Sequence, residues 1–147
     1  MAENIYQQYE RIGREQFKKY CDTNQEIWNL QFTDGPYDRY DGVMISGYSL
    51  VAIEIKKRKH PHDMEWKGEP KGFIFEKTKY DGLKEADADE QFFITIFEDA
   101  IVCWNITHMK PNWIKRKYAS NHTRQMKMDK EVTYLTLEES SHIIRIK

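Results

Sequence analysis

The segment from Tyr40 to Arg58 constrains the fold of this chain more than any other. It reads YDGVMISGYSLVAIEIKKR, in which two runs of apolar and β-branched residues are separated by Ser46-Gly47. β-Branched residues favour strands, whereas glycine and serine are typical of turns. The segment therefore predicts strands over residues 41–46 and 50–58 that pair as a hairpin.

Alternation along the second predicted strand separates two faces, because residues two apart in a strand share a face. One face is expected to enter a core and contains Val51, Ile53 and Ile55. The opposite face contains Leu50, Ala52, Glu54, Lys56 and Arg58. A hairpin of this length would bring Asp41 beside the polar end of the second face. The pattern predicts that two carboxylates and a lysine converge at one edge of a sheet.

These residue types suit metal-assisted chemistry on phosphates. Carboxylate oxygens are hard ligands of the kind that Mg²⁺ and Mn²⁺ prefer. Such a metal can lower the pKa of bound water and offset the charge of a phosphate, and a nearby lysine can stabilise the charge that develops. Glu-x-Lys alone is common on solvated strand ends. Its combination with Asp41-Gly42 and a preceding amphipathic helix favours a functional site.

Periodicity and turn residues predict the other elements. Helices are predicted over residues 3–21 and 77–88. Strands are predicted over residues 72–75, 91–97, 101–106, 131–137 and 142–146. Turns or loops are expected at 33–39 and 60–71, and residues 108–130 carry no clear pattern. This order predicts a single α/β domain over residues 1–147, with a mixed central sheet flanked by helices.

Composition limits the classes of protein to which the chain can belong. Of its 147 residues, 39% are hydrophobic and 14% are aromatic, which is enough for one apolar core. The net charge of −1 argues against binding of nucleic acid through bulk charge, but not against an enzyme with a local basic patch and a divalent metal. The cysteines have no zinc-site spacing, and no signal peptide or membrane span is seen, so a cytoplasmic location is expected.

Asp41-Gly42 followed by Glu54-Ile55-Lys56 resembles the core motif of the PD-(D/E)XK nuclease superfamily. The segment FIFEKTKYDGL, over residues 73–83, resembles the strand and lysine-bearing helix of phage and bacterial members, including Holliday junction resolvase-like proteins. The resemblance covers about residues 5–106. Tyr40 stands where the motif has proline, a position at which the family often departs from its pattern.

The resemblance implies a restriction-endonuclease-like core, with the order helix, three strands, helix, strand. It also implies phosphodiester hydrolysis that depends on Mg²⁺ or Mn²⁺. Carried over by position, Asp41 and Glu54 would bind the metal, and Lys56 would be the catalytic lysine.

Two further catalytic candidates come from the predicted helices. Many members of the family place a glutamate of the first helix at the site. Glu10 is preferred to Glu15 here, because Glu10 flanks the apolar stripe of the helix. Lys77, at the start of the second predicted helix, could reach the scissile phosphate or the guide strand.

Basic residues near the motif, and a later basic cluster beside a tryptophan, are candidates for DNA contact. Aromatic side chains beside basic ones can stack on unpaired bases. The candidates are Lys57, Arg58, Lys59, Trp113, Lys115, Arg116 and Lys117. The competing interpretation is ordinary solvated charge.

Together these features predict a divalent-metal-dependent DNA endonuclease of resolvase or restriction type that acts on phage or mobile-element DNA. Branched and single-stranded DNA are the candidate substrates, and family analogy suggests a homodimer. One alternative is a catalytically silent nucleic-acid-binding module on the same fold. Another is a domain that binds a small molecule or a protein and carries the motif by chance. The intact set of Asp41, Glu54 and Lys56 argues against decay of the site.

Overall fold

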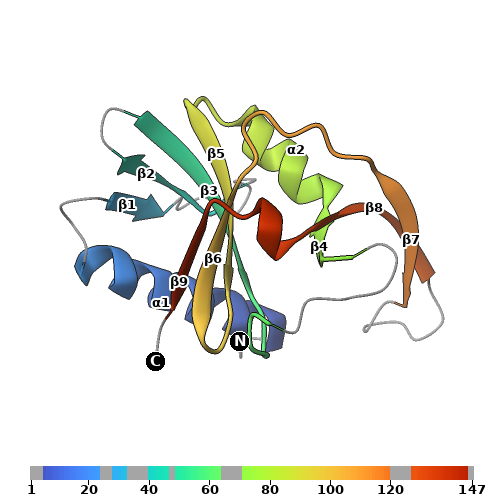
Figure 1. Cartoon of the computed structure of the whole chain (residues 1–147), viewed down its shortest axis with the longest axis horizontal. Coiled ribbons are helices and arrows are strands. Elements are labelled where there is room, and N and C mark those ends of the chain that lie inside the picture. The colour runs from blue at the N-terminus through green and yellow to red at the C-terminus, as the bar shows by residue number, and fades with distance from the viewer. Residues whose placement is uncertain are drawn as a thin grey trace.

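The chain folds into an α/β structure with a large mixed sheet and a smaller antiparallel sheet, shown in Figure 1 as a computed structural model. The described residues are 5–23, 28–32, 40–46, 49–63, 71–119 and 127–145. Their helices are α1 (Ile5–Thr23) and α2 (Lys77–Glu85), with a 3-10 turn at Leu137–Glu139. The strands are β1 (Trp28–Phe32), β2 (Gly42–Ser46), β3 (Ser49–Lys57), β4 (Phe73–Glu76), β5 (Glu90–Ile96), β6 (Ala100–Asn105), β7 (Ile114–Ala119), β8 (Lys127–Leu135) and β9 (His142–Arg145).

The large sheet has the strand order β1-β2-β3-β5-β6-β9. β1, β2 and β3 form an antiparallel meander, and β5 then pairs with β3 in parallel. A parallel pair needs a crossover connection, and the segment between β3 and β5 that contains α2 provides it. The smaller sheet has the order β4-β8-β7 and is antiparallel throughout.

Both faces of the large sheet are covered by apolar clusters. On one face, Phe17 and Cys21 of α1 pack with buried residues of β3 that include Ile53 and Ile55. On the other face, Ala52 of β3 packs in a cluster with Leu83 of α2 and with aromatic residues of β4, β5 and β6. These aromatic residues are Phe73, Phe75, Phe93 and Trp104. β3 is therefore a central strand between two layers, and a polar side chain in its buried middle, such as that of Glu54, is largely removed from water.

The predicted α/β class, with a mixed sheet and helices, is confirmed. The hairpin predicted at 41–46 and 50–58 is β2 and β3, and its alternation places Val51, Ile53 and Ile55 in the cluster under α1. The hairpin predicted at 91–97 and 101–106 is β5 and β6. The predicted glycine at position 47, the turn at 33–39 and residues 64–70 of the predicted loop lie outside the described residues.

Three departures from the predicted elements are caused by contacts with other parts of the fold. α2 ends at Glu85 rather than at residue 88, because the backbone and carboxylate of Asp89 both bond to Leu50 and draw the chain into the sheet. β1 and β7 were not predicted, since their sequences WNLQF and IKRKYA lack a strong strand pattern. Pairing with β2 and β8 stabilises them as strands despite that pattern. None of the described helices is long and apolar enough to cross a membrane.

Candidate active site on strand β3

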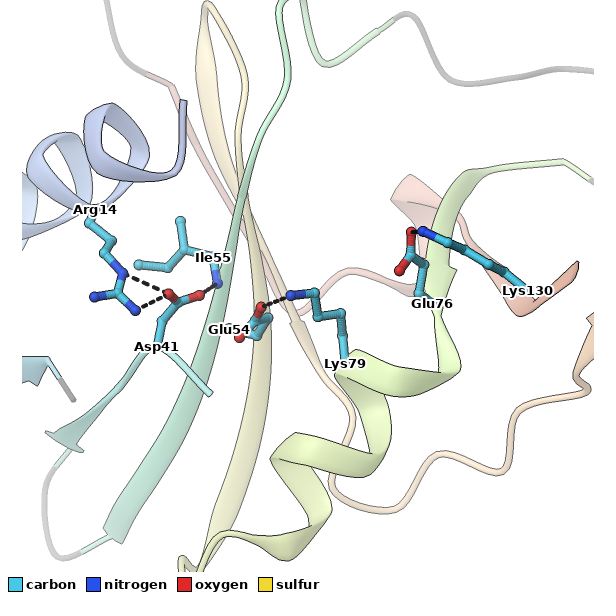
Figure 2. A network of polar contacts seen from close by, with 7 residues as sticks. All are labelled: Arg14, Asp41, Glu54, Ile55, Glu76, Lys79 and Lys130. Atoms are coloured by element: carbon cyan, nitrogen blue, oxygen red, sulfur yellow. Dashed lines mark hydrogen bonds and ion pairs between the residues drawn. The ribbon is translucent and has the colours of Figure 1, made fainter. Parts of the chain in front are cut away.

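Asp41 lies immediately before β2 and is held by contacts from two elements. Its backbone N–H donates to the carbonyl of Ile53 at 2.9 Å, which continues the β2–β3 pairing. Its Oδ2 accepts a hydrogen bond of 2.7 Å from the backbone N–H of Ile55. Its Oδ1 accepts one of 2.7 Å from Nε of Arg14, and Nη2 of Arg14 contacts the same oxygen (Figure 2). Asp41 therefore links α1 to the end of the central strand.

Glu54 is the second carboxylate of the site and is more deeply buried. Its side chain is 8% exposed, and Oε1 lies 3.1 Å from Nζ of Lys79 on α2. Burial and the nearby charge of Asp41 raise the pKa of Glu54 to about 8, and the ammonium of Lys79 opposes part of this increase. A hydrogen bond with Asp41 also favours the protonated form. At neutral pH the carboxyl group of Glu54 therefore keeps its proton.

Lys56 follows Glu54 on the same face of β3 and is exposed at the surface. Partial desolvation by the surrounding chain lowers the pKa of Lys56, and the charge of Arg58 lowers it further. Glu76 and Glu10 act in the opposite direction. The site therefore combines two neighbouring carboxyl groups with a lysine that gives up its proton more readily than a solvated lysine.

Lys79 was not among the predicted site residues, although it contacts Glu54 directly (Figure 2). Burial alone would lower the pKa of Lys79, but the carboxylates of Glu54, Asp41 and Glu10 outweigh burial and raise it. A sequence signal for its position does exist. Lys79 precedes the buried Leu83 by four residues, so both lie on the helix face that packs on the sheet.

Lys77, the predicted lysine of this helix, lies elsewhere. Its Nζ is 2.8 Å from Oδ2 of Asp81, one turn further along α2. The hydrogen bond that Lys77 donates to Asp81 raises the pKa of Lys77, as expected for a surface pair. The two lysines are only two residues apart and therefore point in different directions from the helix.

The two candidate glutamates of α1 have different surroundings. The charge of Glu10 acts on both Lys56 and Lys79, which places Glu10 within electrostatic range of the β3 site. Glu15 accepts a hydrogen bond of 3.1 Å from Arg11 on the exposed side of the helix. The charges at the site thus come from β3, α2, α1 and the residue that precedes β2.

Three of the predicted DNA-contacting residues make contacts within the fold. Nζ of Lys57 donates to Gln16 of α1 at 2.8 Å, on the face opposite Glu54. The guanidinium of Arg58 donates to the carbonyl of Ile74 at 2.8 Å and lies over the ring of Phe73. Trp113 packs against the rings of Tyr80 and Phe75. These three side chains therefore make contacts between elements of the fold: Lys57 contacts α1, Arg58 contacts β4, and Trp113 contacts β4 and α2.

The other predicted DNA-contacting residues lie at the surface. Lys59 and Lys115 are exposed. Arg116 is also exposed, and it donates to the hydroxyl of Tyr134 at 2.8 Å. The backbone of Lys117 pairs with Asp129 between β7 and β8, and its side chain lies outside the described residues.

The donor atoms at this site suit a hard divalent cation. Asp41 and Glu54 supply two carboxylates in direct contact, both largely shielded from water. Within the described residues, no cluster of three or more His, Cys, Asp or Glu side chains is positioned to bind a metal. Mg²⁺ is commonly held by one or two carboxylates, with waters and substrate phosphates completing its shell. Asp41 and Glu54 fit that arrangement.

Comparison with known proteins adds no relative. No protein-family model, curated protein or solved structure matches this chain.

Proposed function

We propose that the protein is a divalent-metal-dependent DNA endonuclease that hydrolyses phosphodiester bonds and selects branched or single-stranded substrates. The observation that carries this proposal is the largely buried pair of Asp41 and Glu54, with Lys56 two residues after Glu54 on β3. A buried acidic pair with a perturbed pKa is typical of functional sites. The element order supports the proposal in part. α1, the three strands β1 to β3, α2 and β5 follow the order helix, three strands, helix, strand that the PD-(D/E)XK resemblance implies, with β4 of the smaller sheet as an additional strand before α2.

In this proposal Asp41 and Glu54 hold Mg²⁺ or Mn²⁺. When bound, the metal supplies a Lewis acid and a water of lowered pKa. Glu54 must give up its proton to become a ligand, and the ammonium of Lys79 favours the ionised form. Lys56 places a positive charge at the strand end, where it can stabilise a developing phosphate oxyanion. Glu10 contributes negative charge that helps to keep Lys56 and Lys79 protonated.

Cleavage assays on plasmid, single-stranded and branched DNA with Mg²⁺ or Mn²⁺ test this function. Wild-type protein should cut at least one of these substrates, and chelation of the metal should stop cleavage. Glu15→Gln is a matched control, because Glu15 pairs with Arg11 on the exposed side of α1. Failure of purified wild-type protein to cut any substrate with either metal would reject the nuclease proposal.

The second candidate is a catalytically silent DNA-binding module. The observation that favours it is that each carboxylate already has a cationic partner, Arg14 for Asp41 and Lys79 for Glu54. DNA binding that persists without metal and without cleavage would support this alternative. The proposed cytoplasmic location and homodimer are common to both candidates.

Replacement of Lys56 by alanine should separate catalysis from metal binding. The change removes a cation without removing a carboxylate ligand, so Mn²⁺ affinity should persist or increase. Cleavage should fall by about 100- to 1,000-fold, the loss typical for one electrostatic donor to a developing oxyanion. Calorimetry of Mn²⁺ binding, with cleavage kinetics on the same preparation, measures both quantities. Equal loss of both would assign Lys56 to metal binding or folding.

Replacement of Lys79 by glutamine should have a larger effect than replacement of Lys77. Loss of the Lys79 ammonium removes a charge that lowers the pKa of Glu54, so less Glu54 is ionised at neutral pH. Cleavage at pH 7 should fall by about tenfold at most, and the rising limb of the pH–rate profile should move to higher pH. Lys77→Gln is the control, since Lys77 pairs with Asp81. An unchanged profile for Lys79→Gln would remove Lys79 from the site.

A further inference from the structure

Arg14 holds Asp41 in a way that bears directly on metal binding. Nε and Nη2 of Arg14 both contact Oδ1 of Asp41, while the backbone N–H of Ile55 donates to Oδ2. Both oxygens of Asp41 are therefore engaged by donors. Lys79, by contrast, makes a single contact with one oxygen of Glu54. Of these two cations, Arg14 therefore makes more contacts with its carboxylate.

A guanidinium and a divalent cation cannot share this oxygen at low cost. Each needs the same lone pairs, and two cations at contact distance repel strongly where water is largely excluded. The side chain of Asp41 is only 13% exposed, so solvent screens this repulsion poorly. The side chain of Arg14 is 36% exposed, so it has access to water after it leaves Asp41.

We propose that Arg14 is an internal counter-cation that competes with the divalent metal for Asp41 and sets the metal concentration at which the site fills. This inference rests on the proposed function, in which Asp41 and Glu54 are the metal ligands. Arg14 is a positioning residue here, because it holds a ligand and does not itself touch the metal. In the metal-free protein it keeps Asp41 against the end of β3, and it releases Oδ1 when the metal binds.

Mn²⁺ titrations of the full-length protein without DNA test the competition. Arg14→Gln keeps a hydrogen-bond donor but removes the charge, and Arg14→Lys keeps the charge but loses the two-nitrogen contact. Arg14→Gln should bind Mn²⁺ about tenfold more tightly than wild type, the factor expected when one charge-assisted hydrogen bond no longer competes. Arg14→Lys should be intermediate. Arg11→Gln is the control on the same helix and should bind as wild type does, because Arg11 pairs with Glu15.

Thermal unfolding distinguishes competition from a purely structural role, because only competition makes the difference in Tm between Arg14→Gln and wild type depend on Mn²⁺. Without metal, Arg14→Gln should melt below wild type, because the ion pair to Asp41 is lost. At saturating Mn²⁺ the difference in Tm should narrow, because metal-loaded wild type has also given up that pair. A difference in Tm that stays constant with and without Mn²⁺ would assign Arg14 to structure alone and overturn the proposal.

The outcomes separate this inference from the proposed function. In one outcome, wild type binds Mn²⁺, Glu54→Gln does not, and Arg14→Gln binds no more tightly than wild type. This outcome would overturn the competition but would still support the metal site. Absence of Mn²⁺ binding in wild type and in both Arg14 variants would overturn both. Binding seen in Arg14→Gln but not in wild type would support the competition. Circular dichroism checks folding, and Arg14→Lys decides the question if Arg14→Gln does not fold.

Discussion

Replacement of Glu54 by glutamine should nearly abolish cleavage and, at the same time, stabilise the metal-free protein at alkaline pH. The pKa of Glu54 is about 8 in the folded protein against 4.5 ordinarily, chiefly because of burial. The folded state thus binds this proton more tightly than the unfolded state does. Its contribution to stability is fully present below about pH 4.5 and is lost as the pH rises through about 8.

Glutamine resembles the protonated carboxyl in shape and carries no charge to bury. Each tenfold difference in proton affinity corresponds to about 1.4 kcal/mol, so the gain in unfolding free energy at pH 9 should be on the order of a few kcal/mol. At pH 5 the variant and wild type should be nearly equal. Urea unfolding at both pH values measures the difference. Equal stability at pH 9 would show that Glu54 is not held protonated by the fold.

Replacement of Asp41 by asparagine should also nearly abolish cleavage, but with the opposite effect on stability. Asparagine replaces one of the two carboxylate oxygens with an NH2 group, which cannot accept the hydrogen bond that Asp41 takes there from Arg14 or from the N–H of Ile55. The charge-assisted contacts with Arg14 are lost, at a cost of about 1–3 kcal/mol. The two carboxylates can therefore be distinguished by unfolding experiments even though both variants lose the proposed metal site. Glu15→Gln should change neither the cleavage rate nor the free energy of unfolding.

The second large effect concerns the pH dependence of metal binding. Since Glu54 carries a proton below about pH 8, binding of Mn²⁺ should release it. The affinity for Mn²⁺ should rise about tenfold per pH unit between pH 6 and 7.5, and it should level off above about pH 8. Calorimetry in two buffers with different ionisation enthalpies counts the released proton directly.

Lys56→Ala is the matched control for this experiment, because it alters the site but keeps both carboxylates. It should retain the same slope with pH. Glu54→Gln should bind Mn²⁺ weakly and without that slope. Wild-type Mn²⁺ affinity that does not change between pH 6 and 8 would contradict a proton held on Glu54.

The sequence alone was sufficient for the β2–β3 hairpin and for the two faces of β3. Both depend on local properties, namely a period of two and a turn between strands. The register pairs Gly42 with Ile53, which brings the preceding Asp41 to the level of Glu54. β1 and β7 could not be predicted in this way, because their local preference for the strand conformation is weak and pairing with other strands stabilises them.

The partners of the two carboxylates were decided only by the tertiary structure. Arg14 lies 27 positions before Asp41, and Lys79 reaches Glu54 from a helix that crosses the sheet on the other side. The local pattern of β3 shows that Glu54 is flanked by apolar residues, but not that a second layer of aromatic side chains excludes water around it. Burial and the charges of residues distant in sequence determine the pKa of Glu54 and the contacts that hold Asp41. Both are properties of the packed layers, so no stretch of the sequence taken by itself contains them.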